Sequence, residues 1–70
     1  MFFVKKKKSD PPLFALLDDA AERSKYSYFY YPLFDREIEN AKKWCLKNKY
    51  TMSVDFIREG DVFYKFVPNT

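Results

Sequence analysis

The pattern of apolar and polar residues stands out most at 26–34, Tyr-Ser-Tyr-Phe-Tyr-Tyr-Pro-Leu-Phe, where six of nine residues are aromatic. These rings occupy both odd and even positions. A β-strand at about 25–33 would therefore project apolar side chains from both faces of its sheet. A chain of 70 residues has little material to cover both faces, so one aromatic set is expected to stay accessible.

Two segments have the spacing of amphipathic helices. The first is predicted to begin at Asp10-Pro11-Pro12, with Asp10 as its cap and proline in its first turn, and to end near Ser24. Its apolar stripe would consist of Leu13, Leu16, Leu17, Ala20 and Ser24, flanked by Phe14 and Ala21. The second follows Asp35 as its cap, and its stripe would consist of Ile38, Ala41 and Cys45, flanked by Trp44 and Leu46.

Residues 50–67 alternate in the manner of a β-hairpin around Gly60, the only glycine. A three-residue loop at 58–60 is predicted, because it keeps one face apolar, whereas a two-residue loop would mix the faces. The predicted pairs are Phe56 with Val62, Val54 with Tyr64, and Met52 with Phe66. The opposite face would carry Thr51, Ser53, Asp55, Ile57, Phe63 and Lys65.

Residues 1–8 favour a short first strand that ends in four lysines, or a solvated terminus. The predicted element order is therefore β-α-β-α-β-β. It indicates one α+β domain over residues 1–70, in which two helices pack on one face of a small, largely antiparallel sheet. Phe29, Tyr31 and Leu33 are expected to face the helices, and Tyr26, Tyr28 and Tyr30 the open side.

Composition argues against catalysis. The chain has no histidine and a single cysteine, which removes the commonest general base, the usual Cys/His zinc sites and any internal disulfide. It also has no phosphate-binding glycine loop. We therefore expect no enzyme, no cofactor, no metal and no small-molecule substrate. Cys45 is expected to be a small buried hydrophobic residue. No membrane-spanning segment or secretory signal is apparent, which predicts a cytoplasmic protein.

The hypothesis that remains is binding to a macromolecule, and a protein partner is favoured, either another protein or a second copy of this chain. Tyrosine anchors interfaces well, because it buries a large area and keeps a polar tip. The predicted contact residues are Tyr26, Tyr28, Tyr30, Phe63 and Ile57, with Lys5, Lys6, Lys7 and Lys8 steering an acidic partner. Two alternatives are binding of single-stranded nucleic acid by stacking on these rings, and coverage of the tyrosine face by residues 1–8.

A capped helix that carries Ala-Lys-Lys-Trp at 41–44 and then a hairpin looks like many small accessory proteins. In size and in its lack of catalytic groups, the chain resembles the phage and mobile-element products that bind a host protein or defence complex and block it. That likeness implies an inhibitor or regulator and identifies no family.

Overall fold

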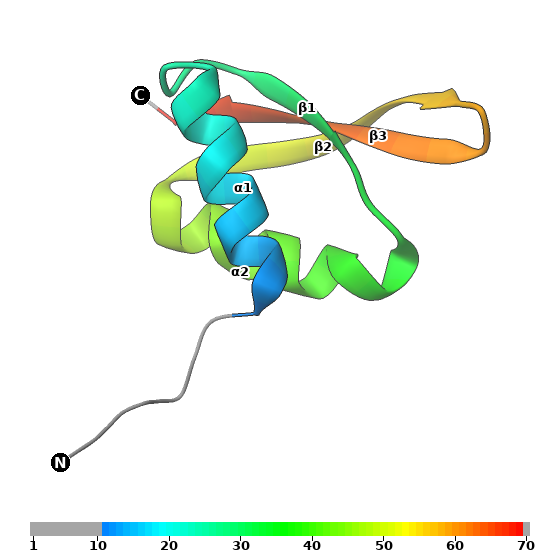
Figure 1. The fold of residues 1–70 in the computed structure, drawn as a ribbon, viewed down its shortest axis with the longest axis horizontal. Helices are drawn as coiled ribbons and strands as arrows, with labels where there is room; N and C mark the ends of the chain where they lie inside the picture. Colours follow the sequence, from blue (N-terminus) through cyan, green and yellow to red (C-terminus); the bar gives the residue numbers. More distant parts are fainter. Residues whose placement is uncertain (1–10, 70) are drawn as a thin grey trace, which may run out of the picture.

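The computed structural model describes residues 11–69, in which two helices pack on one face of a three-stranded antiparallel sheet (Figure 1). This arrangement confirms the predicted α+β class. The predicted strand at 1–8 lies outside the described residues. The elements are α1 (Pro12–Arg23), β1 (Phe29–Pro32), the 3₁₀ turn η2 (Asp35–Glu37), α2 (Ile38–Asn48), β2 (Tyr50–Arg58) and β3 (Asp61–Pro68).

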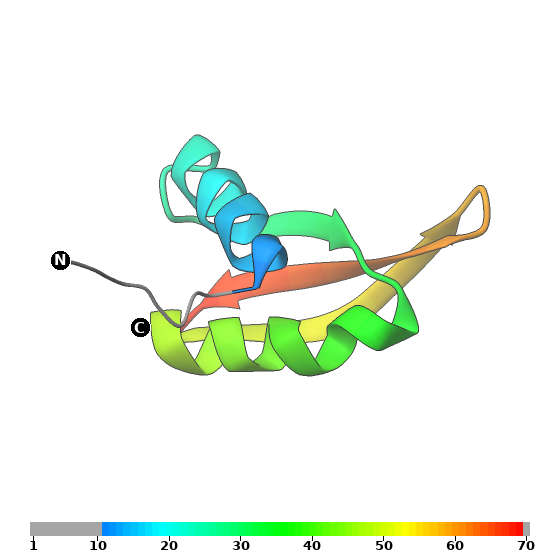
Figure 2. The same ribbon diagram turned by 60° about the horizontal axis from the view of Figure 1, so that its bottom comes forward.

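The strand order is β1-β3-β2, so the last strand of the chain lies in the centre of the sheet. The hairpin of β2 and β3 extends beyond the helices to its turn (Figure 2). Its outer part therefore has no helix above it. The side chains there are correspondingly accessible, and Val54 and Ile57 are 64% and 71% exposed.

Helix α1 ends at Arg23 with Ser24 as its C-cap, close to the predicted end, but its buried face is turned relative to the prediction. Pro11 is the N-cap, without a side-chain cap, and Asp10 lies outside the described residues. The buried residues are Leu13, Phe14, Leu17 and Ala21, whereas Leu16 is 52% exposed. The helix packs against both α2 and β1, which draws Phe14 and Ala21 inward. Both flanking residues thus belong to the core, and the predicted stripe was wrong at Leu16.

A tight turn after α1 shortens the aromatic strand at its start. Lys25 and Tyr26 have φ of 57° and 61°, in the left-handed region that few non-glycine residues adopt. Two serine hydroxyls hold this turn: Ser24 Oγ donates to the Ala21 carbonyl at 2.9 Å, and Ser27 Oγ donates to the Ser24 carbonyl at 2.6 Å. Such local bonds compete with a strand ladder. The strand therefore begins at Phe29 instead of residue 25.

The second helix is entered through a 3₁₀ turn, and the predicted cap at Asp35 was wrong. Phe34 is the N-cap of this turn, and its backbone N–H donates to the Glu37 carboxylate at 2.9 Å. In α2 the buried residues are Ala41, Trp44 and Cys45. The two residues predicted to flank the stripe differ in burial: Trp44 is 1% exposed and belongs to the core, whereas Leu46 is 83% exposed.

The hairpin combines the predicted register with the register that was rejected, one on each side of a bulge. Its turn has two residues, Glu59 and Gly60, with φ of 53° and 85°, so the predicted three-residue loop was wrong. Positive φ at both central residues matches the twist of a two-residue hairpin turn. A bulge at Asp55 then shifts the register. Below the bulge the predicted pairs Val54–Tyr64 and Met52–Phe66 are confirmed, whereas above it Phe56 pairs with Phe63 instead of Val62.

The core lies between the sheet and the two helices and is rich in aromatic rings. Phe29 stacks on Phe66 with centroids 4.8 Å apart, and Trp44 meets both rings edge-on. The indole Nε1–H of Trp44 donates to Asp18 Oδ1 at 2.8 Å, which joins α2 to α1. The predicted inward set is confirmed, since Phe29 and Leu33 are buried and Tyr31 packs against the core.

Two buried titratable groups predict that the fold weakens at alkaline pH. Burial raises the pKa of the Cys45 thiol from 9.0 to about 11, and it also raises the pKa of the Tyr50 hydroxyl. Above pH 9.0 the unfolded chain releases these protons more readily than the folded chain, so the free energy of unfolding should fall as pH rises toward 11. Urea unfolding at pH 8, 9, 10 and 11 measures this decline.

The matched control is the double variant Cys45→Ala/Tyr50→Phe, which lacks both groups. Its free energy of unfolding should decline less between pH 9 and 11 than that of the wild type. The Tyr50 hydroxyl oxygen is buried and finds no hydrogen-bond partner within residues 11–69, so its removal costs little at neutral pH. An equal decline in both proteins would contradict the assignment to these two groups.

Candidate interaction surface

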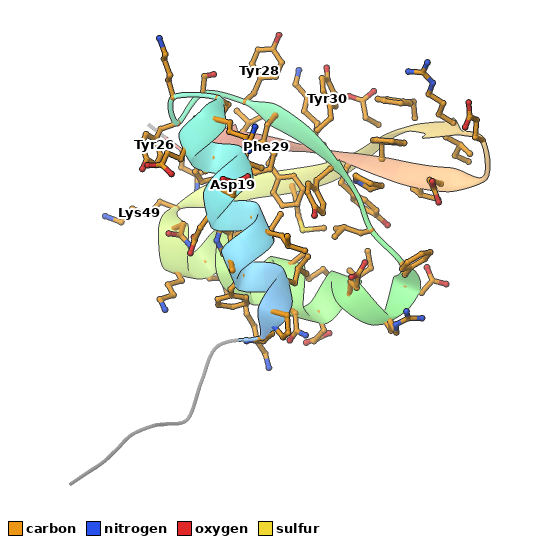
Figure 3. The ribbon with its side chains drawn as sticks, viewed as in Figure 1. Asp19, Tyr26, Tyr28, Phe29, Tyr30 and Lys49 are labelled. Carbon is orange, nitrogen blue, oxygen red and sulfur yellow. The ribbon has the colours of Figure 1, made fainter. Side chains whose placement is uncertain are left out.

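The sheet face opposite the helices carries a row of four aromatic rings, which we call the open-face cluster: Tyr28, Tyr30, Phe56 and Phe63. The Tyr28 and Tyr30 centroids are 5.9 Å apart, those of Tyr30 and Phe56 are 5.6 Å apart, and those of Phe56 and Phe63 are 4.8 Å apart. Tyr28, which directly precedes β1, and Tyr30 on β1 project to one side of the sheet, and Phe29 projects to the other (Figure 3). The row thus crosses all three strands.

The bulge at Asp55 is the reason that Phe56 belongs to this cluster. In a regular hairpin Phe56 would share a face with Val54 and Met52, which lie on the helix side. The extra residue moves Phe56 to the open side, where it stacks on Phe63 with an interplanar angle of 6°. Alternation alone gave no indication of this position, because it assigns Phe56 to the core. The one signal in the sequence was a possible two-residue turn at 59–60, because with that turn a bulge is needed to keep Val54 and Met52 on the helix side.

The same shift removes Ile57 from the predicted surface. Ile57 follows Phe56 and pairs with Val62, so its side chain projects to the other side of the hairpin. Tyr26 is also misplaced in the prediction. The turn after α1 carries it beside the C-terminal end of that helix, away from Tyr28 and Tyr30 (Figure 3). Its proximity to Tyr50 contributes to the raised pKa of that residue.

Three predicted residues, Tyr28, Tyr30 and Phe63, do come together on the open face. They remain partly accessible: Tyr28 is 55% exposed and Tyr30 is 43% exposed, and Phe56 beside them is 38% exposed. Lys5, Lys6, Lys7 and Lys8 lie outside the described residues. A connected group of accessible rings on this scale differs from the scattered apolar residues of an ordinary protein surface.

Lys65 supplies a positive charge to the cluster. It lies on β3 and pairs across the sheet with Tyr30 on one side and Ser53 on the other. Its Nζ is 4.9 Å from the Tyr28 ring centroid and 6.0 Å from that of Tyr30, within range of a cation–π interaction. No carboxylate of residues 11–69 forms an ion pair with it.

Charge over the rest of the fold is balanced. The chain has 13 basic and ten acidic residues, and residues 11–69 contain nine of each. The remaining five lie in the N-terminal segment: Lys5, Lys6, Lys7, Lys8 and Asp10. The net charge of +3 therefore comes from the N-terminal segment. The open-face cluster has aromatic area and one lysine, but it is not part of a broad basic surface.

Features of other kinds of site are sparse in this fold. Among residues 11–69, no three His, Cys, Asp or Glu side chains are grouped to hold a metal ion. The thiol of Cys45 is buried, as predicted.

A shallow hollow between the end of β1 and the hairpin turn is lined by Pro32, Leu33, Phe34 and Asp61. None of the helices in the described part of the chain has the length and apolarity needed to cross a membrane.

The fold and its open-face cluster define a small α+β domain with an aromatic surface. Comparison with protein-family models, with curated proteins and with solved structures finds no match for this chain.

Proposed function

We propose that this protein is a non-enzymatic docking module that binds another protein through the open-face cluster and acts by occupying that partner's surface. The observation that supports this proposal is the connected row of four rings on the face that no helix covers. Rings held at fixed spacing on a sheet lose little side-chain entropy on binding, which makes them effective anchors. Within this class, we propose that the protein inhibits or regulates a host protein complex, in the manner of small phage and mobile-element proteins.

Tyr30 is the residue whose loss should harm docking most, because its ring touches both Tyr28 and Phe56 and so joins the two halves of the cluster. We expect Tyr30→Ala to weaken partner binding by about 2 kcal/mol or more, roughly 30-fold. Tyr28→Ala should weaken it by a similar amount. The measurement is capture of partners from the source cell on the immobilised full chain, followed by titration of the captured protein.

Tyr26→Ala is the matched control, because Tyr26 is a 64% exposed tyrosine that lies outside the cluster. It should leave binding unchanged, and thermal melts should show all three variants folded at the assay temperature. Equal loss of binding in the Tyr26 and Tyr30 variants, or a loss that follows melting temperature alone, would refute docking through this face.

Single-stranded nucleic acid is the second candidate partner, and the lysine beside two tyrosines is the observation that favours it. The balanced charge of residues 11–69 argues against it, because phosphate contacts require several cations. The two candidates differ in salt dependence. Nucleic-acid affinity should fall steeply and log-linearly between 50 and 300 mM salt, whereas affinity for a ring-centred protein contact should change little.

A further inference from the structure

The open-face cluster has two chemically different halves, and this difference restricts what the docked segment is made of. One half holds Lys65 against Tyr28 and Tyr30. The other half is the stacked pair Phe56 and Phe63, which presents only hydrocarbon. An occupant that matches both halves must carry complementary chemistry at two neighbouring points.

The cationic half is prepared for an anion. The Lys65 ammonium lies over the rings of Tyr28 and Tyr30, and it forms no ion pair with a carboxylate within residues 11–69. An ammonium over an aromatic ring keeps donors free for a further hydrogen bond, since lysine has three N–H groups and no acceptor. A carboxylate bound there would gain a charge-assisted hydrogen bond beside apolar rings that exclude water.

Other charges near this face compete little with Lys65. Arg58 and Asp61 stand opposite each other at the end of the hairpin, so their charges offset one another. Asp55 lies at the bulge on the outer strand β2, at the edge of the face. The centre of the face therefore has a single positive charge, which complements a single carboxylate better than a run of phosphates.

The distance between the two halves sets the spacing of the occupant's side chains. The Lys65 Nζ is 6.0 Å from the Tyr30 centroid, and that centroid is 5.6 Å from the Phe56 centroid. The ammonium is therefore at most the sum of these two distances, 11.6 Å, from the Phe56 ring. An extended chain places residues i and i+2 on one side about 7 Å apart, and residues i and i+4 about 13 Å apart. The i, i+2 spacing fits this limit, and the i, i+4 spacing exceeds it.

We infer that the cluster binds an extended acidic protein segment in which a carboxylate and a large apolar side chain are two residues apart. The carboxylate pairs with Lys65, and the apolar side chain covers the stacked rings of Phe56 and Phe63. This inference rests on the proposed docking function and specifies the chemistry of its partner.

The test is titration of the isotopically labelled full chain with two blocked peptides, one with the central sequence Glu-Thr-Phe and one with Gln-Thr-Phe. NMR spectra follow the side chains of Lys65, Tyr30 and Phe56. We expect these signals to shift with both peptides, and the Glu peptide to bind about 5-fold or more tightly at low salt. Lys65→Met should abolish this preference, because it should weaken binding of the Glu peptide more than binding of the Gln peptide, whose amide oxygen accepts only a neutral-acceptor hydrogen bond from Lys65.

Equal affinities for the two peptides, or equal losses for both in the Lys65→Met variant, would overturn the carboxylate inference. Shifts at the same side chains with an oligo(dT) strand, with an affinity that falls steeply with salt, would overturn it in favour of nucleic acid. The absence of shifts with millimolar Glu peptide would also overturn it. In each case the capture experiment with Tyr30→Ala and Tyr26→Ala decides the docking function separately.

Discussion

Replacing Phe66 with alanine is expected to remove about 3–5 kcal/mol from the free energy of unfolding. Phe66 is fully buried at the centre of the sheet, where it stacks on Phe29 and meets Trp44 edge-on. A domain of this size has a total stability of roughly 4–10 kcal/mol. The variant should therefore lose about half or more of the stability of the domain, which a lower midpoint of urea unfolding, followed by circular dichroism, would show.

Phe63→Ala is a closely matched control for this prediction. Phe63 lies on the same strand and also stacks on a second phenylalanine with centroids 4.8 Å apart. Its ring is on the open face, however, where water reaches it. Because less of its area is removed from water on folding, Phe63→Ala should cost about 1–2 kcal/mol, clearly less than Phe66→Ala. Similar losses in the two variants would mean that the open face is a second core.

Replacing Trp44 with alanine should destabilise the domain by a similar amount, about 3–5 kcal/mol. The indole is 1% exposed, contacts Phe29, Tyr50 and Phe66, and donates a hydrogen bond to Asp18. Its removal leaves a cavity where both helices meet the sheet, and it also leaves the Asp18 carboxylate without its indole donor. The midpoint of urea unfolding, followed by far-ultraviolet circular dichroism, measures the effect.

Leu46→Ala provides the comparison on the same helix. Leu46 is 83% exposed, and alanine is the best helix former, so this change should alter stability by less than about 0.5 kcal/mol. Trp44 and Leu46 flank the same stripe, and only their environments in the fold separate them. Equal effects of the two substitutions would contradict the packing of α2 described above.

The sequence predicted the helices, the hairpin and the α+β class because each depends on local chemistry. Prolines at 11 and 12 and the repeat that follows them specify α1, and Gly60 between two alternating segments specifies the hairpin. The assignment of Phe29 and Leu33 to the helix side also held, since strand alternation leaves only two faces to choose from.

The candidate surface was predicted only in part, because small shifts of the backbone decide which side chains share a face. Tyr28, Tyr30 and Phe63 follow simple alternation and were placed together. Tyr26 does not belong to the surface, because it lies in the turn that the Ser24 and Ser27 hydroxyls hold. One extra residue in β2 places Phe56 on the open face and Ile57 on the opposite face, because a register shift of one residue moves every side chain to the other face.

The sequence by itself determined that two aromatic sets exist and that a chain of 70 residues could bury only one of them. Only the tertiary structure decided which rings form the accessible set, because this depends on contacts between residues far apart in the chain. The two-residue turn at 59–60 pairs Phe56 with Phe63, which places both rings on the open side near Tyr30. The bulge at Asp55 then shifts the pairing by one residue, so that Val54 and Met52 lie on the helix side. Pairing across strands is non-local, so alternation within one strand cannot specify it.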